Sequence, residues 1–206
     1  SDELQGVPIS AIILGGRRAS LAPLVYESFS WQHGVYLGAT MASERTAAQY
    51  GKQGEVRRDP MAMLPFCGYH MADYFRHWLA MGKRASKPPK IFFVNWFRKD
   101  RSGKFIWPGF QENLRILNWI LKRSRGEVGG IETPLGYIPK YEDIDMRGLD
   151  FPKQKWNELF EINGSIWQEE LEAQKAFLEK FGEKLPEELL KEHSGLKKRL
   201  EAAVAK

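Results

Sequence analysis

The sequence of 206 residues contains a single cysteine, Cys67, which excludes a disulfide framework and a thiolate metal site. So little cysteine is typical of a reducing compartment, and we expect a cytoplasmic location. No run of about 18 apolar residues is present, so the sequence predicts no transmembrane helix and no membrane partner. The start, Ser1-Asp2-Glu3, is neither a signal peptide nor an initiator methionine, which indicates a chain cut out of a longer one.

Acidic residues are scarce in the first part of the chain. Residues 1–150 carry 21 basic and 15 acidic side chains, whereas residues 151–206 carry 10 and 11. An excess of positive charge favours an anionic ligand, either a nucleotide or a nucleic acid. A glycine-rich GxxxxGK loop followed by Ser or Thr, which would cradle nucleotide phosphates, is absent from the sequence.

Aromatic and basic residues are concentrated at 91–113, IFFVNWFRKDRSGKFIWPGFQEN. The aromatic residues fall where the hydrophobic pattern keeps changing period, with Arg and Lys between them: Trp96, Phe97, Phe105, Trp107 and Phe110. Flat rings beside cations at the end of a strand indicate a base-stacking pocket next to phosphates. The carboxamide of Asn113 both donates and accepts hydrogen bonds, as reading a base edge requires. The alternative interpretation is that these aromatics pack two strands against a helix.

Two glycines and two arginines, Gly15-Gly16-Arg17-Arg18, follow the first predicted strand. The glycines let backbone N–H groups approach a ligand, and the arginines offer bidentate donors for phosphate oxygens. The alternative is a tight turn with solvated arginines. His33 lies close to Trp31 and is interpreted as a structural histidine in preference to a ligand or an acid–base group.

The hydrophobic patterns predict an α/β protein, in which a mixed α+β sheet is flanked by helices and followed by a helical C-terminal tail. Strands are expected at 8–14, 24–27, 91–97 and 104–107, and helices near 31–41, 70–82, 110–125 and within 153–206. In the helix at 110–125 the spacing predicts a buried stripe of Phe110, Leu114, Leu117 and Leu121. Residues 42–57 are small and polar with two glycines, which is typical of a mobile surface loop.

Several of these motifs, taken in order, resemble GTP-dependent phosphoenolpyruvate carboxykinase between about Gly6 and Leu149. The family shares GGRR, SWQHGV, NWFRKD and most of GKFIWPGFQEN, and its TPIGYVP is similar to TPLGYIP here. The family has FGEN where this chain has Phe110-Gln111-Glu112-Asn113, a change that could narrow the pocket.

The resemblance implies a nucleotide site. Phe97, Phe105 and Phe110 would enclose the guanine, Asn113 would contact it, and Arg17 would touch the phosphates. The remaining candidates for the nucleotide site are their neighbours Trp96, Gln111 and Glu112. A lid loop at about 43–56, with Thr46, Ala47 and Ala48 at its centre, would fold over bound substrates and exclude water.

The resemblance also implies a reaction and an architecture. The family converts oxaloacetate and GTP to phosphoenolpyruvate, GDP and carbon dioxide, a step of gluconeogenesis, with Mn²⁺ or Mg²⁺ as cofactor. Its phosphate loop, metal ligands and oxaloacetate-binding residues lie upstream of the segment that this chain resembles. We therefore expect no catalytic residue and no metal ligand here, and no activity of the chain alone. Residues 1–150 would form part of the nucleotide-binding domain, and residues 151–206 a helical tail packed on it.

The expected partners are oxaloacetate or phosphoenolpyruvate and a guanine nucleotide, with no nucleic acid, in an enzyme that is a monomer at full length. Two other interpretations compete with this one. The first is a non-catalytic guanine-nucleotide-binding module, which needs only the aromatic pocket and Arg17. The second is a basic nucleic-acid-binding domain, which the charge of residues 1–150 and the interleaved aromatics would support.

Overall fold

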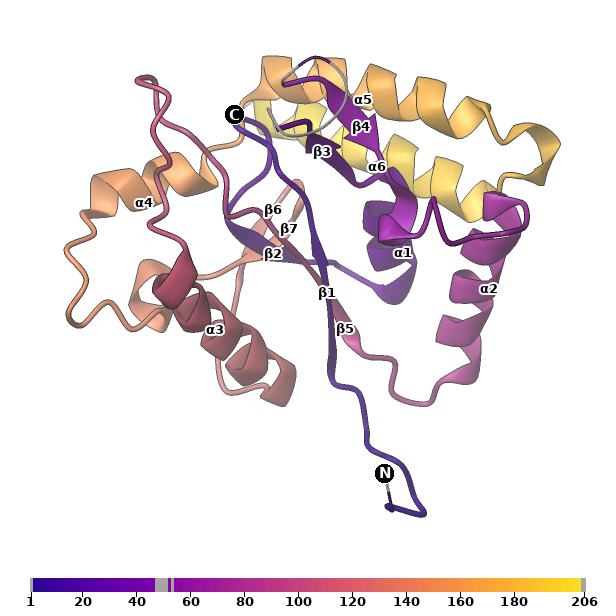
Figure 1. Ribbon diagram of the computed structural model, residues 1–206, viewed down its shortest axis with the longest axis horizontal. Helices are drawn as coiled ribbons and strands as arrows, with labels where there is room; N and C mark the ends of the chain where they lie inside the picture. Colours follow the sequence, from indigo (N-terminus) through magenta and orange to yellow (C-terminus); the bar gives the residue numbers. More distant parts are fainter. Residues whose placement is uncertain (1, 47–51, 53, 205–206) are drawn as a thin grey trace.

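The computed structural model describes residues 2–46, 52 and 54–204, apart from the side chain of Val204. Figure 1 shows strands running through the middle of the molecule, with helices on both sides of them. This arrangement confirms the predicted α/β class with a mixed sheet. No helix in the described part of the chain is long and apolar enough to cross a membrane.

A five-stranded sheet in the order β1-β5-β2-β7-β6 forms the centre. Its strands are β1 (Ala11–Gly15), β2 (Val25–Glu27), β5 (Lys90–Val94), β6 (Ile131–Thr133) and β7 (Gly136–Ile138). β1 and β5 pair in parallel, with Gly15 opposite Val94, and the other neighbours pair antiparallel. The loops that follow β1 and β5 therefore leave the same edge of the sheet side by side, which is where ligands bind in sheets with parallel strands.

The helices cover the sheet from two sides. They are α1 (Trp31–Thr40), α2 (Met71–Arg84), α3 (Asn113–Arg125), α4 (Lys153–Phe160), α5 (Gly164–Glu179) and α6 (Glu187–Val204). Short 3-10 turns also occur in the described part of the chain: η1 (Pro60–Ala62), η2 (Phe110–Glu112), η3 (Tyr141–Asp143) and η4 (Gly182–Lys184). In Figure 1, α1 and α2 lie to the right of β1 and β5, and α3 lies to the left.

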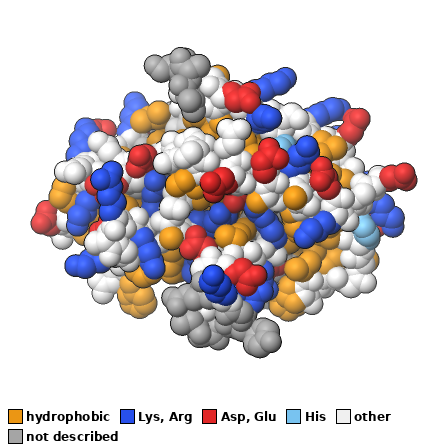
Figure 2. Space-filling model, turned by 90° about the horizontal axis from the view of Figure 1, so that it is seen from above, with side chains coloured by type: hydrophobic (Ala, Val, Ile, Leu, Met, Phe, Trp, Pro, Cys, Tyr) orange, Lys and Arg blue, Asp and Glu red, His pale blue; other side chains and the backbone are white. Residues whose placement is uncertain are grey.

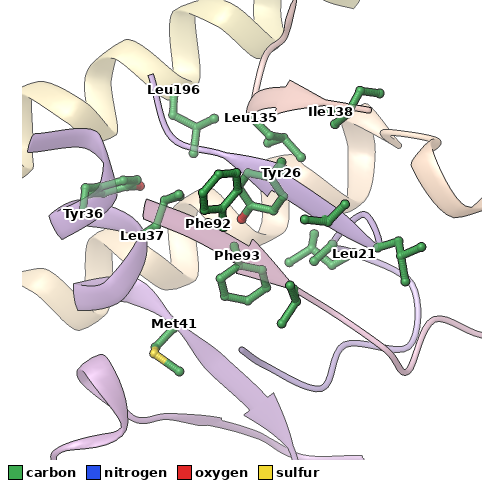
Figure 3. Close-up of a cluster of buried hydrophobic side chains, with 14 of the residues drawn as sticks. Leu21, Tyr26, Tyr36, Leu37, Met41, Phe92, Phe93, Leu135, Ile138 and Leu196 are labelled. Atoms are coloured by element: carbon green, nitrogen blue, oxygen red, sulfur yellow. The ribbon is translucent and has the colours of Figure 1, made fainter. Parts of the chain in front are cut away.

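Side chains of β5 alternate between these two helical layers, as the pleat of a strand requires. The ring of Phe92 meets the indole of Trp119 in α3 edge-on, with 5.9 Å between centroids. Ile91 points the other way, toward α1, where it lies so close to Gly34 that a Cβ there would be 2.4 Å from its Cδ1. Figure 3 shows the core continuing around Phe93 and Tyr26 toward Leu196 of α6.

A second, two-stranded sheet lies beside α1. It consists of β3 (Ala42–Glu44) and β4 (Val56–Arg58), which pair antiparallel with Ser43 opposite Arg57. The lid loop predicted at about 43–56 is therefore wrong at its ends, because it begins within β3 and ends within β4. Its residue Thr46 is described, whereas Ala47 and Ala48 lie outside the described residues.

Three of the strand predictions were wrong in extent, and the strand expected at 8–14 begins only at Ala11. The strand expected at 91–97 ends at Val94, because the side chain of Asn95 bonds to the neighbouring loop and to the N–H of Phe97. The strand expected at 104–107 is reduced to a single bridge between Lys99 and Phe105. Asp100 explains this difference, because its Oδ1 accepts the backbone N–H groups of Ser102 and Lys104 and closes the loop with a side chain.

The buried stripe predicted for the helix at 110–125 was also wrong. The α-helix begins at Asn113, and the buried residues are Ile116, Trp119 and Ile120. Phe110, Leu114 and Leu121 are 91%, 68% and 51% exposed. The predicted and the observed sets of residues both have helical spacing. The set that faces the sheet is the one that places the large ring of Trp119 against Phe92.

Candidate nucleotide-binding site

The loop after β5 carries the predicted base-stacking rings. Phe97 and Phe105 meet edge-on, with ring centroids 5.9 Å apart and an interplanar angle of 75°. The Nζ of Lys99 lies 5.3 Å from the centre of the Phe105 ring. Phe105 is 57% exposed, so one face of its ring is open to solvent. Two adjacent rings with an open face and a cation beside them are suited to stack a base.

The next turn places Phe110 beyond these rings. Gly109 has a φ of 74°, which glycine adopts without strain. Phe110 has a φ of 41°, a left-handed conformation that costs a residue with a side chain about 1–3 kcal/mol. With 91% of its surface exposed, Phe110 is held outside the core and remains available as a further wall for a ligand.

Asn113, the first residue of α3, is fixed by a tryptophan. The indole Nε1 of Trp107 donates a hydrogen bond to Oδ1 of Asn113 at 2.9 Å. Trp107 is 1% exposed and packs edge-on against Phe151, with 5.4 Å between ring centroids. The amide of Asn113 is therefore held by a side chain that belongs to the core.

The segment after β1 brings a cation to the same place. The guanidinium carbon of Arg17 lies 5.7 Å from the centre of the Phe97 ring. The backbone at Gly16 passes close to β3, and a Cβ there would lie 2.6 Å from the carbonyl oxygen of Ala42. The sequence alone did not indicate this close approach. The predicted phosphate-binding arginine and a predicted base-stacking ring are thus brought together by two loops that are distant in sequence.

Arg18 points elsewhere and has a structural role. Its Nη2 donates to Oε2 of Glu170 in α5 at 2.8 Å, and Arg58 of β4 donates to Oε1 of the same carboxylate at 2.5 Å. Burial raises the pKa of Glu170, but hydrogen bonds and charge from Arg18 and Arg58 outweigh burial and lower it overall. Glu170 therefore stays ionised and joins the arginine loop to the C-terminal helices.

Asn95 connects the two loops, and sequence reasoning missed it. The residue is fully buried, and its Oδ1 accepts the N–H groups of Arg18 and Phe97, both at 3.2 Å. Its Nδ2 donates to the carbonyl oxygens of Arg18 and Ala22 at 2.8 and 2.9 Å. A carboxamide directly after an apolar strand was the available signal, since a buried amide needs both donors and acceptors around it.

The base of the predicted lid loop is bonded to the arginine segment as well. The N–H of Arg17 donates to Oγ of Ser43 at 3.1 Å, and the N–H of Glu44 donates to the carbonyl oxygen of Arg17 at 2.8 Å. Strand β3, which leads into the lid loop, is thereby placed next to Arg17.

The remaining candidate residues surround the aromatic cluster without entering it. Trp96 is half-buried against the core, and Gln111 is exposed. Glu112 pairs with Arg115 one turn further along α3. Within the described residues, no group of three or more His, Cys, Asp or Glu side chains is placed to hold a metal ion.

Charge on the surface is mixed. Figure 2 shows Lys and Arg side chains interspersed with Asp and Glu over the face in view, without a stripe of one sign. The excess of basic residues in 1–150 is therefore not concentrated on that face.

Comparison with known proteins decides the family. A family model described as the phosphoenolpyruvate carboxykinase C-terminal P-loop domain matches residues 1–199. The chain belongs to the GTP-dependent phosphoenolpyruvate carboxykinase family. The predicted resemblance is confirmed, and the match extends about 50 residues beyond Leu149, the end of the resemblance seen in the sequence motifs.

Two curated relatives show how much of the family's protein this chain covers. It is 52% identical over 199 residues to a protein of Thermoplasma volcanium named phosphoenolpyruvate carboxykinase [GTP], covering 97% of this chain and 33% of that protein. It is also 52% identical over 202 residues to a protein of the same name from Anaeromyxobacter dehalogenans, covering 98% and 34%. The chain thus spans about a third of the length of the curated relatives it matches.

Proposed function

We propose that this chain acts as the C-terminal part of a GTP-dependent phosphoenolpyruvate carboxykinase and supplies the guanine side of its nucleotide site. The observation that carries the proposal is the position of Arg17, whose guanidinium lies 5.7 Å from the ring centre of Phe97. A nucleotide that stacks on the Phe97–Phe105 pair has its phosphates within reach of a cation held by the neighbouring loop. Asn113 and Phe110 complete the pocket on the side of α3.

In the reaction, oxaloacetate and GTP give phosphoenolpyruvate, GDP and carbon dioxide. The residues of this chain bind and orient the nucleotide, and Arg17 neutralises part of the phosphate charge. The lid loop, with Thr46, Ala47 and Ala48, covers the site and keeps water away from the reacting groups. Mn²⁺ or Mg²⁺ is the proposed cofactor, but no cluster of ligands for it is present among the described residues. We place its ligands in another part of the enzyme, as the family resemblance implies.

Three further features belong to this proposal. Residues 1–150 contribute to the nucleotide-binding domain, and residues 151–206 pack on it as a helical tail. The enzyme acts as a cytoplasmic monomer on small molecules and has no nucleic-acid partner. Because the phosphate loop and the metal ligands are not in its sequence, the 206-residue chain alone forms no phosphoenolpyruvate from oxaloacetate and GTP.

A second candidate function is binding of guanine nucleotides without catalysis. It is favoured by one observation, that the aromatic rings, Asn113 and Arg17 all come from this chain and are held by its own contacts. Phosphoenolpyruvate formation by an enzyme that contains this chain together with a phosphate loop and metal ligands would rule out this alternative.

The nucleotide site is tested by changing one exposed phenylalanine at a time. Trp96 and Trp107 lie at the pocket, so tryptophan fluorescence should report GDP binding to the chain. Stacking a base on an aromatic ring contributes about 1–3 kcal/mol, so Phe105→Ala should weaken GDP binding about tenfold or more. Phe66→Ala, which removes a 75% exposed ring from the loop between η1 and α2, is the matched control and should leave binding unchanged. Equal affinities of the two variants would refute the proposed pocket.

A further inference from the structure

The hydrogen bond between Trp107 and Asn113 determines which end of the Asn113 amide faces a ligand. An indole N–H only donates, so the atom that it contacts at 2.9 Å must be the amide oxygen. The opposite orientation would place the NH₂ group of Asn113 against another donor. This bond therefore settles an assignment that is ambiguous for most asparagines.

The orientation leaves the amide nitrogen as the group that points away from Trp107. Among the described residues, no acceptor is bonded to Nδ2 of Asn113, and the residue is only half-buried. Asn113 lies one turn after Phe110, since its backbone N–H bonds to the carbonyl oxygen of Phe110. The pocket thus presents a donor, with no acceptor from this residue, beside its outermost aromatic ring.

A donor at this position discriminates between purines. Guanine carries the acceptor O6 where adenine carries the N6 amino group, which is a donor, and both bases carry the acceptor N7. An NH₂ group of Asn113 that faces this edge can bond to guanine O6, whereas it meets adenine N6 as one donor meets another. A site built to bond one polar group rejects the analogue that leaves it unpaired.

We propose that Trp107 is a positioning residue that makes the pocket selective for guanine over adenine by locking the Asn113 amide with its NH₂ group outward. This inference rests on the proposed function, because it concerns the same pocket. Trp107 need not touch the nucleotide to play this role. Its ring is buried and packed on Phe151, so the core holds the orientation of the amide before a ligand arrives.

Replacing Trp107 by Phe keeps a large aromatic ring and removes only the indole N–H and part of the ring. The Asn113 amide is then free to rotate by half a turn, and the rotated form offers an acceptor that suits adenine N6. We expect the ratio of the ADP to GDP dissociation constants to fall about tenfold in this variant, by loss of one oriented hydrogen bond. Isothermal titration calorimetry with GDP and with ADP measures this ratio.

Trp31→Phe is the matched control. Trp31 also uses its indole N–H in a hydrogen bond, to the carbonyl oxygen of Trp78 at 2.7 Å, but it belongs to the α1–α2 contact. This variant loses the same kind of bond and should keep the wild-type ratio of the two dissociation constants. A fall of equal size in both variants would assign the effect to general loosening of the fold and overturn the proposal.

A double-mutant cycle separates positioning from packing. In Asn113→Leu there is no amide to orient, so adding Trp107→Phe should not change the ratio of dissociation constants further. A further fall in the double variant would show that Trp107 acts independently of Asn113, which contradicts the inference.

Two results distinguish failure of this inference from failure of the proposed function. If the wild-type chain prefers GDP and Trp107→Phe keeps the full preference, only the role of Trp107 is wrong. If the folded wild-type chain shows no preference, both the proposed guanine pocket and the role of Trp107 are wrong.

Should Trp107→Phe not fold, the indole N–H signal of Trp107 in nuclear magnetic resonance provides the test. It should exchange with solvent faster in Asn113→Leu than in the wild type, and an unchanged rate would overturn the proposal.

Discussion

His33 is a buried histidine whose ring is held in its neutral form. The N–H of Phe29 donates to Nδ1 of His33 at 3.1 Å, so the proton of the neutral ring lies on Nε2. Burial, assisted by the positive charge of Arg199, lowers the pKa of His33 to about 3. Its position inside the core, 1% exposed and stacked on Phe29, supports the structural role expected from the sequence.

This pKa predicts acid sensitivity. In the unfolded chain the imidazole has a pKa of about 6.5. Below that pH the unfolded state therefore binds a proton, whereas the imidazole in the folded state remains neutral. Stability should therefore fall as the pH decreases from about 6.5 toward about 3, with a slope of up to about 1.4 kcal/mol per pH unit from this group. Urea unfolding measures the slope, which should flatten in His33→Gln and stay unchanged in His77→Gln, a change at an exposed histidine of α2. Equal slopes in both variants would contradict the assignment.

For single residues, the sequence predicted which residue types gather at the site but not where each side chain points. Arg17 and Arg18 are adjacent and identical in type, yet one lies over Phe97 and the other is buried on Glu170, 152 positions away. Asn95 was overlooked for the same reason. Three of its four side-chain hydrogen bonds are made with Arg18 and Ala22, whose proximity depends on the tertiary fold.

Among the elements, α3 combines a buried face with an exposed apolar face. Trp119 is fully buried against Phe92, whereas Leu114, on the same helix, is 68% exposed. Removing a buried tryptophan side chain costs about 3–5 kcal/mol, and changes at exposed positions stay within about 0.5 kcal/mol. We therefore expect Trp119→Ala to destabilise the chain strongly and Leu114→Ala to leave its free energy of unfolding nearly unchanged. Urea denaturation of the two variants tests this, and the reverse order would restore the stripe predicted from the sequence.

Elements with one clear period were predictable, and elements held by side chains were not. The stripe of α2, with Met71, Phe75 and Leu79 inward, follows from its spacing alone. The apolar residues at 104–107 predicted a strand, but Asp100 uses its carboxylate to accept the backbone N–H groups of Ser102 and Lys104, and only one bridge forms. Hydrogen bonds to the same residues lower the pKa of Asp100, which keeps this carboxylate ionised.

For the whole molecule, Glu170 is the residue that joins its parts. It lies in the C-terminal helical region and holds Arg18 from the loop after β1 and Arg58 from β4. Removing one partner of a buried ion pair leaves an uncompensated charge and costs about 3–5 kcal/mol. Glu170→Ala should lower the free energy of unfolding by that amount. Glu172→Ala, at an exposed position of α5, should change it by less than about 0.5 kcal/mol.

Urea unfolding of Glu170→Ala also tests how the C-terminal helices are attached. If they pack on the rest of the chain as one cooperative unit, unfolding remains a single transition with an unchanged dependence on urea concentration. Two transitions would show that residues 151–206 separate from the sheet first. The sequence predicted helices and a packed tail for residues 151–206. It did not indicate that a glutamate bound by two arginines would join this tail to the rest of the chain.

The central claim, that this chain forms a guanine-selective pocket, is tested most directly by calorimetric titration of the wild-type chain with GDP and, separately, with ADP. We predict saturable binding of GDP that is at least about tenfold tighter than that of ADP, because the donor of Asn113 can bond to the acceptor O6 of guanine, where adenine carries a donor. Equal affinities, or no binding of GDP by the folded chain, would contradict it.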